Sequence, residues 1–308
     1  MKLQTVTGTI AVEEVTLADG HGHVWINPPA DAPPSTRLEL RNEAAIHNEL
    51  VEFRESGGSL IVDCQPRDCG RDALMLVKLS EMTGVHITAT TGFHQQKYYP
   101  DSSWLWTATT ETATDYFITE ITVGMRETDG TIPATTLKVG YEGTITGQSE
   151  VLMEAVASAS YQTGAAILFH TEQGRNAEAL LPFFDKHGVA PERLYLCHMD
   201  KRPDAGLHRE LAQAGVLLGY DTFVRPNYNP DKNVWPLVKQ MVADGFEDHI
   251  AIGLDMAIAS MWKSYGGSPG LSVLAEQILP RLRTEGIEEP VIKKLTGKNV
   301  ACRLAHVI

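Results

Sequence analysis

The chain has 308 residues, 43% hydrophobic and 21% charged, with 39 acidic against 26 basic side chains and a formal net charge of −13. These values are typical of a folded globular protein and exclude a disordered chain. Because so acidic a surface repels phosphate backbones and anionic lipid, we expect neither nucleic acid nor a membrane as a partner.

The N-terminal stretch MKLQTVTGTIAVEE lacks the apolar segment of a signal peptide, and no apolar run approaches the length of a membrane span. We therefore expect a cytoplasmic protein. Its four cysteines are too few and too scattered for a disulfide scaffold, which predicts reduced thiols. No linker-like shift in composition divides the chain, so one domain is expected over residues 1–308.

Short β-rich or apolar runs recur along the chain as candidate strands. In chain order they cover residues 19–25, 59–66, 85–94, 137–143, 165–172, 194–200, 216–222 and 250–256. Segments with helical periodicity lie between them, at 36–56, 148–163, 175–187 and 272–285. Glycines at 57, 84, 164, 188, 215 and 245 stand where helices are expected to end before the next strand.

Eight such units in a chain of this length predict an α/β fold of the (β/α)8 TIM-barrel type. The runner-up is a doubly wound open sheet, which would want a glycine-rich phosphate turn after its first strand. Neither GxGxxG nor GxxxxGK[ST] occurs in the sequence, which favours the barrel.

The first candidate strand holds two histidines within ADGHGHVW, residues 18–25. Side chains alternate between the faces of a strand, so His21 and His23 project the same way while Gly22 points oppositely. Two imidazoles on one face are suited to a metal site, but an isolated HxH is also compatible with a pair of partly exposed histidines. The rest of the chain has to decide between these interpretations.

Further polar residues stand on the other candidate strands, each among apolar neighbours. They are Lys138 on the fourth, His170 and His198 at the ends of the fifth and sixth, and Asp255 at the end of the eighth. In a (β/α)8 barrel the carboxyl ends of the strands line the active site. Imidazole and carboxylate are ligands preferred by Zn²⁺, Mn²⁺ or Co²⁺, so the sequence predicts a metal centre at this rim.

Lys138 conflicts with a metal centre as long as it is a cation, because burial and like-charge repulsion both oppose an ammonium there. Two resolutions are open. The side chain can turn into a salt bridge, for example with Glu142, or its amine can react with CO₂ to give a carbamate, an anion able to bridge two metals. Cys64, at the end of the second strand, is either a small buried hydrophobe or an additional thiolate ligand.

The arrangement of HGH on strand one, lysine on strand four, histidines on strands five and six and aspartate on strand eight resembles the phosphotriesterase-like branch of the amidohydrolase superfamily, which includes lactonases and the phosphotriesterase homology proteins. The stretches TVTGTI, TTGFHQQKYYP, KVGYEGTIT and DTFVRPNYNPDK are similar to that branch. The resemblance implies that His21, His23 and Asp255 hold the more buried of two metals and that His170 and His198 hold the more exposed one. It also implies that carboxylated Lys138 and a hydroxide bridge them.

The resemblance further implies a homodimer and a hydrolase that opens a lactone or another carboxylic ester, with zinc, manganese or cobalt as its two divalent ions and Asp255 as the group that accepts the proton. Hydrolysis of organophosphate triesters is the nearer alternative, and a metal-binding barrel without activity is the remote one. His94 stands about where related lactonases place a tyrosine that orients the substrate, so this chain departs from their pattern.

Substrate contacts are expected from the loops after strands seven and eight. Their candidate residues are Arg225, Tyr228 and Lys263, with Lys201 and Arg202 in the loop after strand six as further cations. Convergent arginine and lysine side chains would bind a carboxylate or phosphate by charge-assisted hydrogen bonds. They would then favour a phosphorylated or acidic sugar lactone, whereas single cations are equally compatible with a solvated surface.

Overall fold

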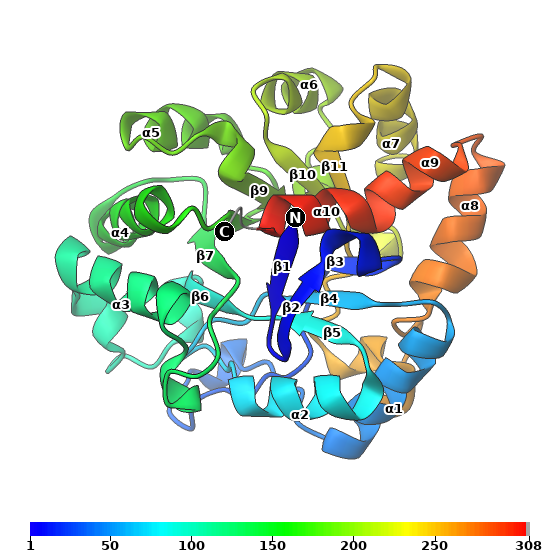
Figure 1. The fold of residues 1–308 in the computed structure, drawn as a ribbon. Helices are drawn as coiled ribbons and strands as arrows, with labels where there is room; N and C mark the ends of the chain where they lie inside the picture. Colours follow the sequence, from blue (N-terminus) through cyan, green and yellow to red (C-terminus); the bar gives the residue numbers. More distant parts are fainter. Residues whose placement is uncertain (306–308) are drawn as a thin grey trace.

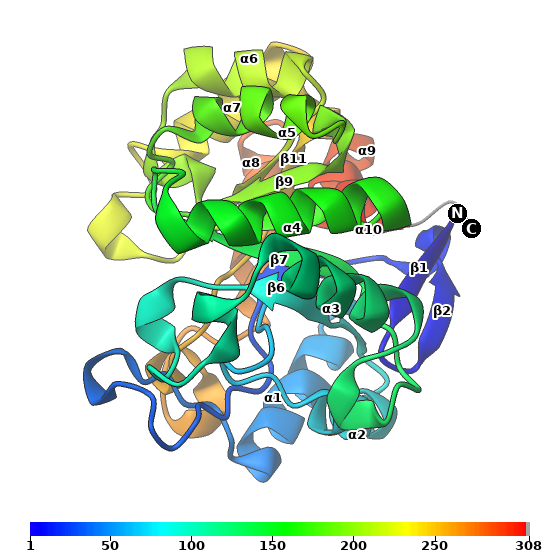
Figure 2. The same cartoon turned by 90° about the vertical axis from the view of Figure 1, so that its left-hand side faces the viewer.

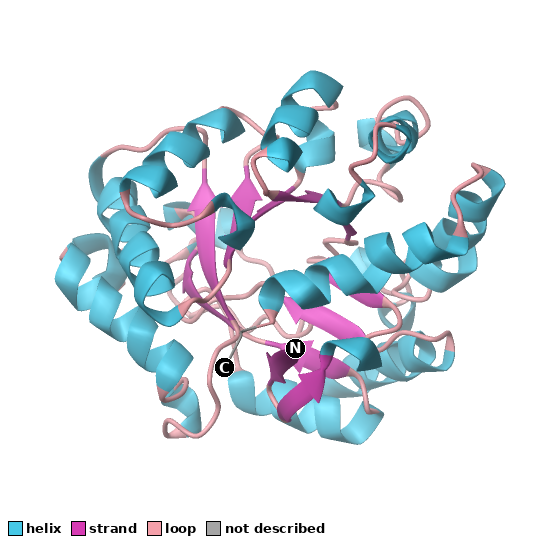
Figure 3. Ribbon diagram, turned by 45° about the horizontal axis from the view of Figure 1, so that its top comes forward, coloured by secondary structure: helices cyan, strands magenta, loops and turns pink. Residues whose placement is uncertain are grey.

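The structure is a computed structural model that describes residues 1–305. Its parallel strands close into a barrel surrounded by helices (Figures 1 and 3). The barrel strands are β3 (Ala18–Gly22), β4 (Leu60–Asp63), β5 (His86–Thr88), β6 (Thr90–Phe93), β7 (Thr136–Tyr141), β8 (Ile167–Thr171), β9 (Leu194–Cys197), β10 (Leu217–Tyr220) and β11 (Ile250–Ile252). All eight predicted strand regions are therefore present, and the predicted barrel is confirmed.

Two sheets make up the closed barrel, with strand orders β3-β4-β5 and β6-β7-β8-β9-β10-β11. The predicted third strand, residues 85–94, is interrupted at Ala89, so that β5 pairs with β4 and β6 pairs with β7. The barrel closes between β3 and the end of β11, where the amide of Asp255 donates to the carbonyl of His21 at 2.8 Å. Gly253 permits this approach, because a Cβ there would lie 2.8 Å from the backbone nitrogen of His21.

Alternation along the strands separates two apolar clusters. Leu60 and Val62 of β4 lie in a cluster with Leu168, Tyr195 and other side chains that fill the barrel. Ile61 instead belongs to the larger cluster, in which the outer faces of the strands pack against the helices. Residues two apart share a face of a strand, so one run of sequence serves both clusters.

The surrounding helices are α1 (Glu43–Glu55), α2 (Ala73–Thr83), α3 (Thr110–Thr122), α4 (Gly147–Thr163), α5 (Leu180–Lys186), α6 (Ala205–Gln213), α7 (Val234–Ala243), α8 (Leu279–Thr284), α9 (Glu289–Lys293) and α10 (Asn299–Leu304). The six glycines expected at helix ends all have positive φ, for example Gly84 with φ 69° after α2. Glycine adopts this left-handed conformation without a Cβ clash. The helix predicted at 148–163 is confirmed as α4.

Three predicted helices differ from the structure at their N-terminal ends. The first was expected from residue 36 but begins at Glu43, where the Asn42 side chain accepts from the amide of Ala45. The segment before it is extended, because Leu40 pairs with Ile26. The helix expected at 175–187 becomes a 3₁₀ turn followed by α5. The one expected at 272–285 starts as a π-helical turn before α8, which accommodates the missing amide of Pro280.

An N-terminal hairpin that the sequence did not predict precedes the barrel: β1 (Lys2–Thr5) pairs antiparallel with β2 (Gly8–Ala11). The hairpin and α10 lie across one end of the barrel, beside the N-terminus (Figures 1 and 2). Leu3 and Leu304 belong to the cluster that fills the barrel interior, so these segments close that end. Within residues 1–305 no helix has both the length and the apolar character needed to cross a bilayer.

Candidate active site

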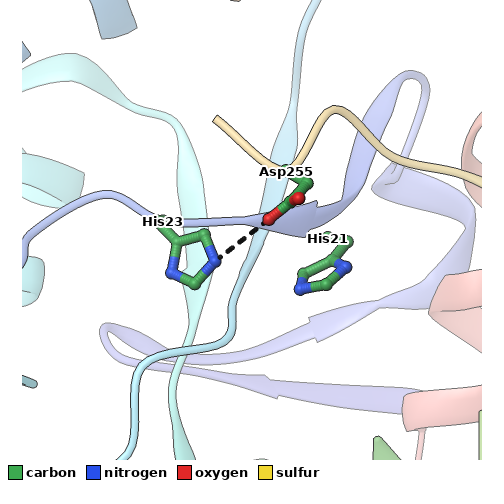
Figure 4. Close-up of side chains that lie close together, drawn as sticks. All are labelled: His21, His23 and Asp255. Carbon is green, nitrogen blue, oxygen red and sulfur yellow. Dashed lines mark ion pairs between the residues drawn. The ribbon is translucent and has the colours of Figure 1, made fainter. Parts of the chain in front are cut away.

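The histidines and the aspartate predicted as ligands come together at the carboxyl ends of the barrel strands. The His21 ring centroid lies 5.7 Å from that of His23 and 4.6 Å from that of His198, which in turn is 4.5 Å from that of His170. The Asp255 carboxylate comes within 3.5 Å of His23 Nε2 (Figure 4). His21, His23 and Asp255 come from the first and last strands of the barrel, and His170 and His198 from β8 and the end of β9, so they meet because the barrel closes.

A carboxylate that the sequence analysis did not assign holds two of these imidazoles. Asp221, which follows β10, is fully buried and lies within 3.2 Å of His21 Nδ1 and 2.8 Å of His198 Nδ1. It also accepts from the amide of His198, whose backbone has a positive φ of 64°. Such a carboxylate fixes which ring nitrogen carries the proton and makes the other nitrogen a better ligand. Its signal in the sequence was the acidic residue at the end of GYD, residues 219–221, on an otherwise apolar strand.

His23 is oriented in a similar way by an amide. Its Nδ1 lies 3.0 Å from Gln65 Oε1, and the Gln65 amide nitrogen donates to the carbonyl of Cys69 and, at 3.2 Å, to its thiol. These donations fix the oxygen of Gln65 toward His23, so Nδ1 is the protonated ring nitrogen. The lone pair on Nε2 therefore faces the Asp255 carboxylate.

His170 and His198 present two ring nitrogens that face each other. His198 Nε2 and His170 Nδ1 are 2.9 Å apart, while their other nitrogens face the carboxylates of Asp221 at 2.8 Å and Glu172 at 3.6 Å. Asp221 accepts from His198 Nδ1, so His198 Nε2 carries a lone pair, whereas Glu172 is too far from His170 Nε2 for a hydrogen bond. The lone pair of His198 Nε2 is free to accept from His170 Nδ1 or to bind a cation. Among residues 1–305, His21 Nε2 is buried without a hydrogen-bond partner, so the donor set fits divalent metal ions.

Burial keeps these imidazoles neutral. It lowers the pKa of His21 to about 3, with the neighbouring Lys138 adding to the effect, and lowers those of His170 and His198 to about 4. Metal ions bind neutral imidazole, so at neutral pH no proton has to be displaced from these rings. Histidine nitrogens and carboxylate oxygens form two candidate ligand groups, His21–His23–Asp255 and His21–His198–Asp221. In the second group the nitrogens that meet Asp221 are those pointing away from the pocket.

Lys138 lies on β7 with only 1% of its surface exposed, and it lines the same pocket. Within residues 1–305 its Nζ has neither a hydrogen bond nor an ion pair, so the salt bridge that was one of the two resolutions, for example with Glu142, is not formed. Gly92 allows the close approach of β6 to this residue, because a Cβ there would lie 2.2 Å from the carbonyl oxygen of Lys138. A buried ammonium without a partner is strongly disfavoured.

Asp255 follows β11 in the left-handed conformation, with φ 50°. Its Oδ2 accepts from Arg225 at 2.9 Å and lies 4.0 Å from Lys201 Nζ. Burial acts to raise the pKa of Asp255, but the nearby His198 and the guanidinium of Arg225 outweigh it and hold that pKa well below its ordinary value. The carboxylate is therefore ionised and poised to coordinate a cation or accept a proton.

Of the predicted substrate residues, the structure places His94 and Arg225 in the pocket wall and Tyr228 and Lys263 outside it. The pocket is a cavity of about 170 Å³ whose walls include His94, Tyr98, Arg225 and Ile258. His94 stacks on Tyr98 with ring centroids 4.6 Å apart and meets the His170 ring edge-on, so it lies beside the histidine cluster as expected. Its Nδ1 is buried without a partner, and burial holds its pKa well below the ordinary value.

The other candidates lie outside the pocket walls. Lys263 is tied to Glu52 and Glu276, so the structure does not bring it to the site. Arg202 pairs with Glu178 at 2.9 Å, on the surface. Among the described residues, Tyr228 contacts the site only through Lys201. Its ring lies 5.3 Å from Lys201 Nζ, which is 4.0 Å from the Asp255 carboxylate.

The Cys64 thiol donates to the carbonyl of Val62 at 3.3 Å and is fully buried in the cluster inside the barrel. Burial raises the pKa of this thiol, which opposes the thiolate that metal binding needs. Cys64 is absent from both candidate ligand groups of the described residues. Of the two interpretations of Cys64, the structure favours the buried hydrophobe.

Comparisons with known proteins bear on the same residues. A model of the phosphotriesterase family matches residues 1–301. A phospho-furanose lactonase of Mycoplasmopsis synoviae is 29% identical over 96% of this chain and 89% of its own, and an N-acetyltaurine hydrolase of Bos taurus is 30% identical over 85% and 78%. The crystal structure of a lactonase from Listeria monocytogenes has a TM-score of 0.92 at 26% identity and covers 99% of both chains.

The match runs from the N-terminal hairpin to α10 and includes each strand that contributes to the pocket. The resemblance inferred from the sequence motifs is thereby confirmed, together with the barrel and the hydrolytic class. The chain belongs to the phosphotriesterase family of metal-dependent hydrolases.

Proposed function

We propose that this protein is a binuclear metal-dependent hydrolase that opens a lactone or another carboxylic ester. The observation that carries the proposal is the convergence of four imidazoles and the Asp255 carboxylate in one buried cluster. There His23 Nε2 lies 3.5 Å from Asp255, and His198 Nε2 lies 2.9 Å from His170 Nδ1. Relatives named lactonases agree with this chemistry.

In this proposal His21, His23 and Asp255 hold the more buried ion, and His170 and His198 hold the more exposed one. Lys138, carboxylated, supplies an anion between them. Zinc is the first choice because imidazole and carboxylate ligands suit it, and manganese and cobalt are the alternatives. The partnerless, buried amine of Lys138 supports the carbamate, since it removes the unpaired positive charge.

Divalent ions bound there lower the pKa of a coordinated water and polarise the oxygen of the carbonyl under attack. The residues of the chain perform the other tasks. Asp255, ionised and within hydrogen-bond reach of its neighbours, accepts the proton of the attacking water and passes it to the leaving alkoxide. Arg225 holds the carboxylate in place through its hydrogen bond at 2.9 Å. Asp221 and Gln65 keep three imidazoles in the ligating tautomer.

The substrate we propose is a phosphorylated or otherwise acidic sugar lactone. A cavity of about 170 Å³ suits a small molecule, and its walls carry two arginines as well as His23, His170 and Asp255. An acidic substrate also agrees with the relative named phospho-furanose lactonase. Neutral triesters, the nearer alternative, would gain nothing from these guanidinium groups.

The relatives named N-acetyltaurine hydrolase raise hydrolysis of an acylated amine as a second candidate. The test is a panel of four substrates: a phosphorylated aldonolactone, its unphosphorylated form, paraoxon and N-acetyltaurine. Protein loaded in turn with Zn²⁺, Mn²⁺ and Co²⁺ is assayed against each. We expect turnover of the lactones, abolished in Asp255→Asn. Turnover of paraoxon or N-acetyltaurine alone would replace the proposal, and no turnover by any metal form would refute it.

We propose further that the enzyme acts as a cytoplasmic homodimer with a small-molecule substrate. Trp104 and Trp106, two large apolar side chains of the loop after β6, pack within the chain: Trp104 on Tyr116 at 4.9 Å and Trp106 on Tyr99 at 5.6 Å between ring centroids. Support for a dimer therefore rests on the family resemblance. Sedimentation velocity of purified protein decides the oligomeric state, and a monomer at micromolar concentration would contradict it.

A further inference from the structure

The segment between β3 and α1 covers the pocket. Ile26 and Leu40 pair through two backbone hydrogen bonds of 2.9 and 3.0 Å, so the residues between them form a loop whose two ends lie side by side. The hydroxyl of Thr36 donates to the carbonyl of Lys97 at 2.6 Å and ties this cover to the loop after β6. Its side chains in the pocket wall are Pro28, Ala32, Thr36, Arg37 and Leu38.

Arg37 is the charged member of this cover that reaches the pocket, and its guanidinium has spare hydrogen-bonding capacity. Its one ion pair, with Glu39 at 3.8 Å, is too long for a hydrogen bond. Glu39 is engaged at 2.6 Å by Arg41, which lies outside the pocket walls. Of the described residues, none accepts a hydrogen bond from the Arg37 guanidinium, although this group carries five N–H donors.

The pocket is a local exception to the acidic character of the chain. Its ionisable walls comprise Lys138, Arg37 and Arg225 as bases and Asp255 as the acid, besides histidines. Arg225 is engaged with Asp255, and Lys138 lies at the buried end with 1% exposure. The Arg37 side chain, 35% exposed, lies at the open end. A substrate whose scissile bond sits among the histidines therefore extends toward Arg37.

We propose that Arg37 is a specificity-determining residue that binds a phosphate group on the end of the substrate remote from the reacting bond. The inference deepens the proposed function and rests on it. A guanidinium with free donors at the mouth of a partly enclosed pocket binds a phosphate through paired, charge-assisted hydrogen bonds. Arg225, whose Nε is buried without a partner, adds a donor on the same wall.

Arg41 provides a matched control for this proposal. It lies in the same stretch of chain, shares the carboxylate of Glu39 and carries the same group, but its guanidinium does not reach the pocket. Arg37→Gln and Arg41→Gln therefore remove equal charge from the same loop. Both side chains are substantially exposed, so neither change creates a buried cavity. Thermal unfolding of both variants checks that the fold is kept.

The experiment measures kcat/KM of wild type and both variants on a phosphorylated aldonolactone and on the same lactone without phosphate. Arg37→Gln should lower kcat/KM roughly ten- to a hundredfold on the phosphorylated lactone, mainly through KM, and by less than about twofold on the neutral one. Arg41→Gln should leave both unchanged. Equal losses on both lactones, or no loss on the phosphorylated one, would overturn the inference while the lactonase function stands.

A binding measurement keeps the inference testable if neither lactone is hydrolysed. Calorimetry compares ribose 5-phosphate with ribose on the metal-loaded protein. We expect ribose 5-phosphate to bind wild type and Arg41→Gln roughly ten- to a hundredfold more tightly than Arg37→Gln. Equal affinity of the three proteins would refute the role of Arg37, whatever the reaction. Failure of the panel in the preceding section, with this difference preserved, would refute the lactonase proposal alone.

Discussion

His198 Nε2 lies 2.9 Å from His170 Nδ1, and the His198 ring is held from behind by the Asp221 carboxylate at 2.8 Å. The His198 ring cannot turn away without giving up that support. Beside it, His21 Nε2 is buried and has no hydrogen-bond partner among residues 1–305. Core histidines satisfy both ring nitrogens with hydrogen bonds, so this arrangement favours a metal site.

Asp221 should control metal affinity without being a ligand of either proposed ion. In Asp221→Asn the amide can accept from only one of the two imidazoles, so His21 and His198 lose their common support. We expect metal affinity to fall about 10- to 100-fold, measured by competition with a chromophoric chelator. Asp185→Asn, on an exposed face of α5, is the control. An unchanged affinity in Asp221→Asn would show that the carboxylate is not needed to orient the rings.

Asp255→Asn should lower kcat far more than KM. The amide keeps the shape of the side chain and an oxygen for coordination, but it cannot accept a proton at neutral pH. General base catalysis contributes about 10²- to 10⁴-fold, so a loss of that order in kcat is expected with metal content near normal. Metal analysis of the same preparation separates lost chemistry from lost metal. An Asp255→Asn enzyme with full kcat would exclude the proton-accepting role.

Substitutions at Lys138 discriminate between an anion and an ammonium in the site. Lys138→Glu places a carboxylate on the same strand, so it should retain metal and part of the activity. Lys138→Met is of similar length but carries no charge, and it should lose at least one ion and nearly all activity. Elemental analysis gives the metal count. If Lys138→Met bound two ions as tightly as wild type, the bridging role would be wrong.

Acid stability should depend on a buried ion pair outside the site. Arg71 and Glu120 are both fully buried and joined by two hydrogen bonds of 2.8 and 2.9 Å. Burial acts to raise the pKa of Glu120, but Arg71 outweighs it and lowers that pKa below the ordinary 4.5. Because the pKa of Glu120 is lower in the folded state, the stability that the ion pair contributes is fully present above the unfolded pKa. That stability is lost as the pH falls through the lower pKa of the folded state.

Glu120→Gln should therefore lower the free energy of unfolding by about 3 kcal/mol at pH 7, because it leaves Arg71 with only Glu127. The variant should also lose less stability than wild type as the pH falls below the ordinary carboxyl pKa of 4.5. Urea unfolding at each pH measures both effects. Glu43→Gln, which breaks an exposed pair with Lys78, should cost less than about 1 kcal/mol. Equal effects of the two variants would contradict this account.

The residues that could be anticipated from the sequence are those whose chemistry conflicts with their surroundings. Two histidines sharing a strand face, and a lysine on an apolar strand, are anomalous before any coordinates exist. Strand positions followed from short β-rich or apolar runs, and the glycines marked the helix ends. These are local patterns, so a single stretch of sequence is enough to reveal them.

The remaining features depend on which segments meet. Asp221 supports His21 across 200 positions of sequence, and nothing near either residue announces the partnership. Lys263 was expected at the substrate because of its loop, yet Glu52 on α1 is close enough to bind it. Arg37 was missed because the sequence predicts a helix from residue 36. In the structure Leu40 pairs with Ile26, and the segment between them, which includes Arg37, covers the pocket. Tertiary proximity decides each case.

The most direct test of the central claim is a crystal structure of the metal-loaded protein with anomalous diffraction recorded on both sides of the zinc absorption edge. Our account predicts two anomalous peaks, one among His21, His23 and Asp255 and one beside His170 and His198, with continuous density beyond Lys138 Nζ that reaches both. The contradicting result would be a pocket without anomalous signal in protein saturated with zinc, with Lys138 ending at its amine and the four imidazoles hydrogen-bonded to one another or to water.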